Sequence, residues 1–133
     1  DTISFTGSTT RAQRMLKAQA MVESQQPELA RQAVALLESW LSQHPRDGHA
    51  WDLTGQGLGL MQGPLRSLRA QAEARAVRFD LVAAIDRLLA AQDLARQLVA
   101  QGKLGRAQEI DASIIDTRLR QLRQLRREQT LQR

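Results

Sequence analysis

Residues 33–55 read AVALLESWLSQHPRDGHAWDLTG and contain the end of one helix, a turn and the start of a second helix. Pro45 cannot donate the next backbone hydrogen bond, so it ends the first helix, and the run from Pro45 to Gly48 is typical of a turn. On either side, small and large apolar residues recur at helical spacing, which predicts two helices packed face to face. These residues are Ala33, Leu37, Trp40 and Leu41 before the turn, and Trp51, Gly55 and Leu58 after it.

This order of residues resembles the tetratricopeptide repeat, a helix–turn–helix unit of about 34 residues with the pattern W-x2-L-G-x2-Y, then A-x3-F, then P. The residues before the turn match the second half of one repeat, and those after it match the first half of the next. Thr54 stands where the pattern has leucine, and Leu58 stands where it has tyrosine. The resemblance implies antiparallel helix pairs that stack into a solenoid.

Composition favours the same class of fold. The chain has 133 residues, and only 3% of them are aromatic, whereas alanine, leucine, glutamine and arginine dominate. We therefore expect one all-α domain with a substantial core. Cysteine is absent, which excludes a disulfide framework, and no apolar run reaches the roughly 18 residues of a membrane span. Because the chain opens on Asp1 and not on methionine, we expect a piece of a longer protein.

The apolar periodicity predicts a short tetratricopeptide-like solenoid of about six antiparallel helices at residues 9–127. Residues 1–8 are polar and aperiodic and are expected to form a loose lead-in, and residues 128–133 are expected to form a basic C-terminal tail. Capping residues, prolines and glycines mark the helix starts. We place these after Ser8, Thr9 or Thr10, at Pro27, near Trp51, at Leu65, after Asp80 and after Gly105.

The spacing of small residues places the helices in repeat register. Ala33 and Ser67 are a full repeat apart, but Ala84 follows Ser67 by only half a repeat. The helix at residues 65–78 is therefore expected to close one pair and open the next. In stacked pairs the first helix of each pair lines a concave surface. The predicted partner-binding groove consists of His49, Asp52, Gln56, Arg66, Arg69 and Glu73.

Charge is concentrated at the C-terminal end. Residues 117–133 contain six arginines and one glutamate, whereas residues 1–116 contain equal numbers of basic and acidic residues. A basic helix can bind nucleic acid or an acidic membrane surface, which is one hypothesis for function. Aromatic residues that could stack on bases are absent from this stretch, which argues against nucleic acid.

The segment Glu109–Arg120, EIDASIIDTRLR, carries a more specific resemblance. It is similar to the S-x-I-D-x-R-L closing segment of bacterial M48-family zinc metalloproteases, which are exported proteases of the outer-membrane assembly system. Gly63-Pro64, Arg69-Ala70-Gln71-Ala72-Glu73-Ala74 and Ala84-Ile85-Asp86-Arg87-Leu88 resemble the C-terminal tetratricopeptide region of that family. The family usually has glycine where Phe79 stands.

This resemblance implies a non-catalytic protein-interaction module in the periplasm that presents a groove to a protein or peptide partner. The zinc motif H-E-x-x-H is absent from the chain. The resemblance places that motif, and the zinc, in a catalytic domain N-terminal to these residues. A second hypothesis is a stand-alone tetratricopeptide adaptor of another periplasmic or secretion assembly. The sequence does not specify the partner or the oligomeric state.

No catalytic or cofactor site is predicted within the chain. His44 and His49 are its only histidines, and a zinc site needs three or four converging ligands, so we interpret both as surface residues. Gly55, Gly57 and Gly59 do not complete the nucleotide-binding pattern G-x-G-x-x-G. The pattern needs its last glycine at position 60, where Leu60 stands, and no strand is predicted before these glycines. We instead expect these glycines to allow close helix packing.

Overall fold

The computed structural model describes residues 10–61 and 63–132, so the predicted lead-in at residues 1–8 lies outside the described residues. Within these ranges the chain forms six α-helices and no strand, which confirms the all-α class. No helix there is both long and apolar enough to cross a membrane. The helices are α1 (Arg11–Glu23), α2 (Pro27–Gln43), α3 (Gly48–Leu60), α4 (Pro64–Ala76), α5 (Leu81–Ala100) and α6 (Arg106–Leu131).

Each helix start follows from a local signal in the sequence. Thr10 caps α1 in a capping box with the side chain of the third helical residue, and Asp47 and Asp80 accept hydrogen bonds from backbone N–H groups in the first turns of α3 and α5. Pro27 and Pro64 are the first residues of α2 and α4. Proline fits this position because the missing N–H has no partner within the helix.

Two boundaries differ from the sequence-based expectation. The helix expected at residues 65–78 ends at Ala76, and Phe79 follows in the left-handed region with φ of 61°. The N–H of Asp80 then bonds to the carbonyl of Arg75 at 3.0 Å, which closes the helix end in a geometry that glycine favours. The basic residues expected as a tail at residues 128–133 continue α6 as far as Leu131.

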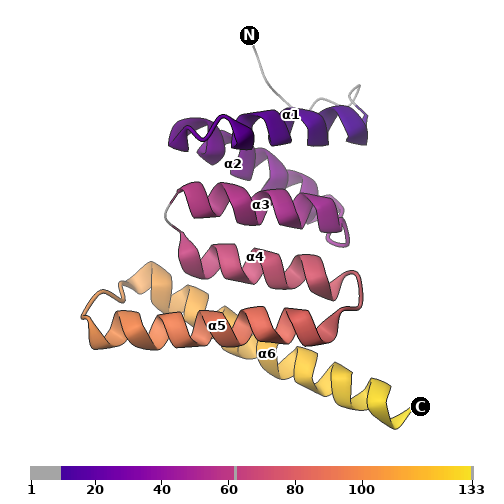
Figure 1. The fold of residues 1–133 in the computed structure, drawn as a ribbon, viewed down its shortest axis with the longest axis vertical. Helices are drawn as coiled ribbons and strands as arrows, with labels where there is room; N and C mark the ends of the chain where they lie inside the picture. The colour runs from indigo at the N-terminus through magenta and orange to yellow at the C-terminus, as the bar shows by residue number, and fades with distance from the viewer. Residues whose placement is uncertain (1–9, 62, 133) are drawn as a thin grey trace.

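The six helices form a stack in which consecutive helices run antiparallel, with α1 and the end of α6 at opposite ends (Figure 1). Every helix packs against its neighbour in sequence. Two further pairs of helices also pack together: α1 with α3, and α4 with α6. The central helix α4 therefore packs against α3, α5 and α6, and it connects the two halves of the molecule.

The core is divided between these halves. Trp40 and Trp51 are half-buried and pack against the core of the first half, as predicted. That core lies mainly among α1, α2 and α3 and consists of Met15, Ala18, Met21, Val22, Ala33, Val34, Leu37, Leu41, Ala50, Leu53, Leu58 and Ala70. The second core lies among α4, α5 and α6 and consists of Leu65, Ala72, Leu81, Ala84, Ile85, Leu88, Ala91, Ile115, Leu119 and Leu122.

Two of the three glycines in the interior of α3 mark close helix contacts. A Cβ atom at Gly57 would lie 2.7 Å from Cγ2 of Val34 on α2. A Cβ atom at Gly55 would lie 3.2 Å from Cγ of Gln71 on α4, and the carbonyl of Gly55 accepts a 2.7 Å hydrogen bond from the Ser67 hydroxyl. These contacts confirm that tight packing on both sides of α3 requires glycine at these positions.

Candidate functional site

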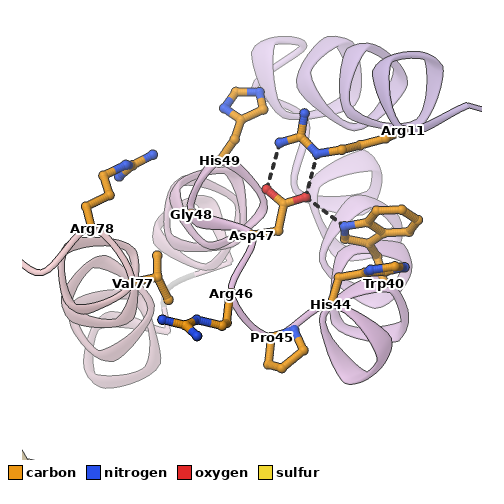
Figure 2. Close-up of a pocket in the computed structure, with 10 residues that line it drawn as sticks. All are labelled: Arg11, Trp40, His44, Pro45, Arg46, Asp47, Gly48, His49, Val77 and Arg78. Atoms are coloured by element: carbon orange, nitrogen blue, oxygen red, sulfur yellow. Dashed lines mark hydrogen bonds and ion pairs between the residues drawn. The ribbon is translucent and has the colours of Figure 1, made fainter.

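An open cleft of about 750 Å³ lies where the α2–α3 turn meets the C-terminal end of α4 (Figure 2). The α1 helix closes it on a third side. Its lining is mostly polar and basic because it gathers a turn and two helix ends, where side chains do not face the core. The residues are Arg11, Trp40, His44, Pro45, Arg46, Asp47, Gly48, His49, Val77 and Arg78.

Asp47 is the structural centre of this cleft. Its carboxylate accepts hydrogen bonds from Nε and Nη2 of Arg11 at 2.8 and 2.7 Å, and from the indole nitrogen of Trp40 at 2.9 Å (Figure 2). It also accepts the N-capping bond from the Ala50 N–H at 3.3 Å. The Arg11 hydrogen bonds, together with those from Trp40 and Ala50, hold the pKa of Asp47 well below its usual range, although burial opposes the shift. One residue thus joins α1, α2 and α3.

The remaining charges of the cleft are cationic. The guanidinium of Arg11 forms an ion pair with Asp47, and this pairing raises the pKa of Arg11. Arg78 pairs with Asp52 at 3.0 Å, and the guanidinium of Arg78 packs against the backbone of Gly48. Arg46 has no carboxylate partner within the described residues. Three arginines therefore line the cleft. Its one acidic residue, Asp47, already accepts hydrogen bonds from Arg11, Trp40 and Ala50.

The two histidines of the cleft lie on opposite sides of Asp47 (Figure 2). His44 stacks on Trp40 with ring centroids 3.8 Å apart, whereas His49 is exposed on the first turn of α3, on the other side of Asp47 (Figure 2). Among residues 10–61 and 63–132, no group of three or more histidine or acidic side chains is placed to hold a metal ion.

A second polar site lies on the face formed by α2, α4 and α6, away from the cleft. Two hollows of about 230 and 290 Å³ adjoin there, and Arg69 lines both. The first is walled by α2, α3 and α4, and the second by α4 and α6. Their lining comprises Glu38, Leu41, Ser42, Trp51, Thr54, Leu58, Arg66 and Ala70 in the first, and Ser113, Ile114, Thr117, Arg118 and Gln121 in the second. We call this pair of hollows the Arg69 channel.

Ion pairs flank Arg69 on both sides. Arg66 bonds to Glu38 on α2 at 2.7 Å, and Arg118 on α6 bonds to both oxygens of Glu73 at 2.8 and 2.9 Å. The carboxylate of Glu73 is 10% exposed, so its pairing with Arg118 holds α4 to α6. Arg69 has neither an ion pair nor a hydrogen bond in the described part of the chain, and its Nε is buried without a partner.

The structure does not bring the six predicted groove residues onto one face. His49 lines the cleft, Asp52 pairs with a cleft arginine, and Gln56 is exposed without lining either site. Arg66 and Arg69 line the Arg69 channel, and Glu73 pairs with Arg118 at the channel's edge. Those of the six that line a hollow are therefore divided between two hollows, and the role of the six as a partner-binding groove stays a prediction.

The reason is the orientation of α3. This helix turns Trp51 and Thr54 toward the Arg69 channel. Each residue advances by about 100° around a helix, so the neighbouring Asp52 and Gln56 point elsewhere.

Sequence reasoning missed most of the cleft. Arg11 and Arg78 carried no motif, Arg46 was part only of a turn signal, and Phe79 was only a departure from the family's glycine. Their proximity depends on contacts among α1, the α2–α3 turn and the end of α4. One signal was available for Asp47, because aspartate directly before a helix is a preferred N-cap. That rule predicts the bond to Ala50, but not the bonds to Arg11 and Trp40.

In comparisons with protein-family models, with curated proteins and with solved structures, nothing matches this chain.

Proposed function

We propose that this chain is a non-catalytic protein-interaction module with a tetratricopeptide-like arrangement, and that it binds an extended segment of a partner protein in the Arg69 channel. The stack of antiparallel helices supports this proposal, because it exposes long faces on which several helices contribute side chains. The sequence resemblance to the C-terminal repeats of M48 zinc metalloproteases supports it independently.

The observation that carries the proposal is the unpartnered Arg69. Its neighbours Arg66 and Arg118 each have a carboxylate within hydrogen-bond distance, but Arg69 between them has none in the described residues. A buried donor without an acceptor costs about 1–3 kcal/mol, and no carboxylate of the described residues offsets this cost at Nε of Arg69. A guanidinium binds a carboxylate most strongly, through two parallel hydrogen bonds.

The proposed ligand group is therefore a carboxylate, either a chain terminus or an acidic side chain of the partner. The adjoining hollows extend from Leu41 and Leu58 on one side of Arg69 to Ile114 on the other. A segment lying along them would place apolar side chains on both sides of its carboxylate. The flanking ion pairs position the walls and keep Arg66 and Arg118 from competing for the ligand.

Peptide binding with a matched pair of variants tests this proposal. We expect extended fluorescein-labelled peptides with apolar residues and a free terminal carboxylate to bind, and their amidated counterparts to bind more weakly. Arg69→Met keeps the apolar stem but removes the charge, and it should lower affinity at least about tenfold, as loss of a charged interface contact does. Arg31→Met is the control, because Arg31 is two-thirds exposed on α2 and pairs only with Glu28. Equal binding by the parent protein and R69M would refute the channel.

We also propose that the parent protein is an exported M48-type zinc metallopeptidase acting in the periplasm in outer-membrane protein quality control. In that arrangement the zinc and its H-E-x-x-H motif belong to a catalytic domain that precedes these residues, and this segment needs no cofactor. The coding sequence upstream of Asp1 tests the proposal. An H-E-x-x-H motif there supports it, whereas a different upstream domain would favour the stand-alone adaptor.

A further inference from the structure

Phe79 combines two properties that the fold alone does not require. It adopts φ of 61°, a conformation that favours glycine, and its side chain is 62% exposed. A bulky residue in the left-handed region is strained, and its ring here gains little from burial. Glycine would make the same turn between α4 and α5 without this cost. Strain of this kind is typical of sites where a side chain is held for binding.

The ring lies beside the cleft at the α2–α3 turn. The guanidinium carbon of Arg46, a cleft residue, lies 5.8 Å from the centroid of the Phe79 ring. Val77 and Arg78, immediately before Phe79, also line the cleft. The exposed ring therefore forms an apolar rim on a basic hollow, and Arg46 joins the two.

We propose that Phe79 and the basic cleft together bind an acidic segment of a partner protein that carries an apolar side chain. The apolar side chain packs on the Phe79 ring, and carboxylates on either side of it reach Arg46 and His49, whereas Arg78 stays paired with Asp52. Charge complementarity selects this partner, because the cleft's one carboxylate, on Asp47, is already bonded to Arg11, Trp40 and Ala50. This docking surface is separate from the Arg69 channel and goes beyond the function proposed above.

A protein partner fits the site better than nucleic acid does. Single-stranded nucleic acid needs a series of aromatic surfaces for successive bases. In the described part of the chain, Phe79 is the one exposed phenylalanine or tryptophan at the cleft, because Trp40 is half-buried and His44 covers a face of its ring. A lone aromatic residue beside arginines is instead typical of the centre of a protein interface.

The substitution Phe79→Gly separates binding from folding. It relieves the left-handed strain, so we expect the melting temperature to rise by roughly 2–6 °C. The probe is an acetylated, amidated peptide of glutamates and aspartates with one central phenylalanine, and its affinity should fall at least about tenfold in F79G. Gln25→Gly is the matched control. Gln25 has φ of 58° at the α1–α2 turn, outside the cleft lining, so Q25G should also raise the melting temperature but leave binding unchanged.

Two further measurements complete the test. Arg46→Met should weaken the same peptide, and a peptide with glutamine and asparagine in place of the acidic residues should bind the parent protein poorly. The proposal is overturned if F79G binds the acidic peptide as tightly as the parent protein, or if an oligonucleotide binds the cleft more tightly than the peptide. R69M should not change this binding, so failure here is distinguishable from failure of the Arg69 channel.

Discussion

At the scale of single residues, Asp47 does more than its position in the sequence suggests. It caps α3, fixes the indole of Trp40 and holds Arg11 of α1 against the α2–α3 turn. Its side chain is only 7% exposed, so the ion pair with Arg11 is better shielded from water than an ordinary surface pair. Removal of its charge would weaken three contacts at once.

We predict that Asp47→Asn lowers the free energy of unfolding by about 1–3 kcal/mol near neutral pH, because asparagine keeps the cap but loses the charge-assisted bonds. The pKa of Asp47 is lowered in the folded state, so its contribution is complete above the pKa of an unfolded aspartate, about 3.9. It is lost as the pH falls from there toward the folded pKa. The difference between parent and variant should therefore shrink below about pH 4.

Urea unfolding at several pH values measures this effect. Asp93→Asn is the control, because Asp93 and its partner Arg96 are both about two-thirds exposed. Such a pair contributes less than about 1 kcal/mol. A D47N variant as stable as the D93N variant at neutral pH would contradict the role of Asp47.

At the scale of elements, α3 is a helix whose composition is set by its neighbours. Glycine weakens a helix interior by about 0.5–1 kcal/mol relative to alanine, yet α3 contains Gly55, Gly57 and Gly59. The absence of a side chain at Gly55 lets α4 pack closely, and its absence at Gly57 does the same for α2. A Cβ at Gly59 would instead meet only the Ser67 hydroxyl at 3.7 Å, which is an ordinary contact. Packing therefore explains two of the three glycines.

Alanine substitutions should consequently have opposite signs. Gly57→Ala places a methyl group 2.7 Å from the stiff side chain of Val34, so we expect a loss of about 1–3 kcal/mol in unfolding free energy. Gly59→Ala should increase the unfolding free energy by up to about 1 kcal/mol through helix propensity. Thermal or denaturant unfolding of both variants tests the pair, and a stabilising G57A would show that α2 and α3 are less tightly packed than described.

At the scale of the whole molecule, two cores meet at α4. Ala70 belongs to the core of the first half, whereas Leu65 and Ala72 belong to that of the second. In a stack of this kind each helix is stabilised mainly by its nearest neighbours. A mutation in one half should therefore destabilise the helices of that half more than those of the other half. The halves should therefore differ in their response to core mutations.

We predict that Leu88→Ala, in the second core, lowers the unfolding free energy by about 2–5 kcal/mol. Leu88 is fully buried, and the large cavity should raise hydrogen exchange in α5 and α6 more than in α1 and α2. Leu53→Ala, in the first core, should give the reverse pattern. Equal increases over all six helices in both variants would mean that the molecule unfolds as a single unit.

The sequence by itself determined the helical class, the order of the helices and most of their starts. These are local properties, because proline, capping side chains and apolar periodicity act within about one helical turn. The sequence also identified Trp40 and Trp51 as residues beside the core. It placed the end of α4 too late, because the helix ends at Ala76 and is followed by Phe79 in the left-handed region. It also did not show that α6 continues to Leu131.

Only the tertiary structure decided which charges meet. Arg66 pairs with Glu38 from two helices earlier, and Glu73 pairs with Arg118 from two helices later. Helix periodicity shows which residues share a face of one helix, but not which face of a second helix lies opposite. That depends on how side chains interlock across the whole stack. For this reason the residues of the predicted groove are divided between two sites, and Arg69 has no carboxylate partner in residues 10–61 and 63–132.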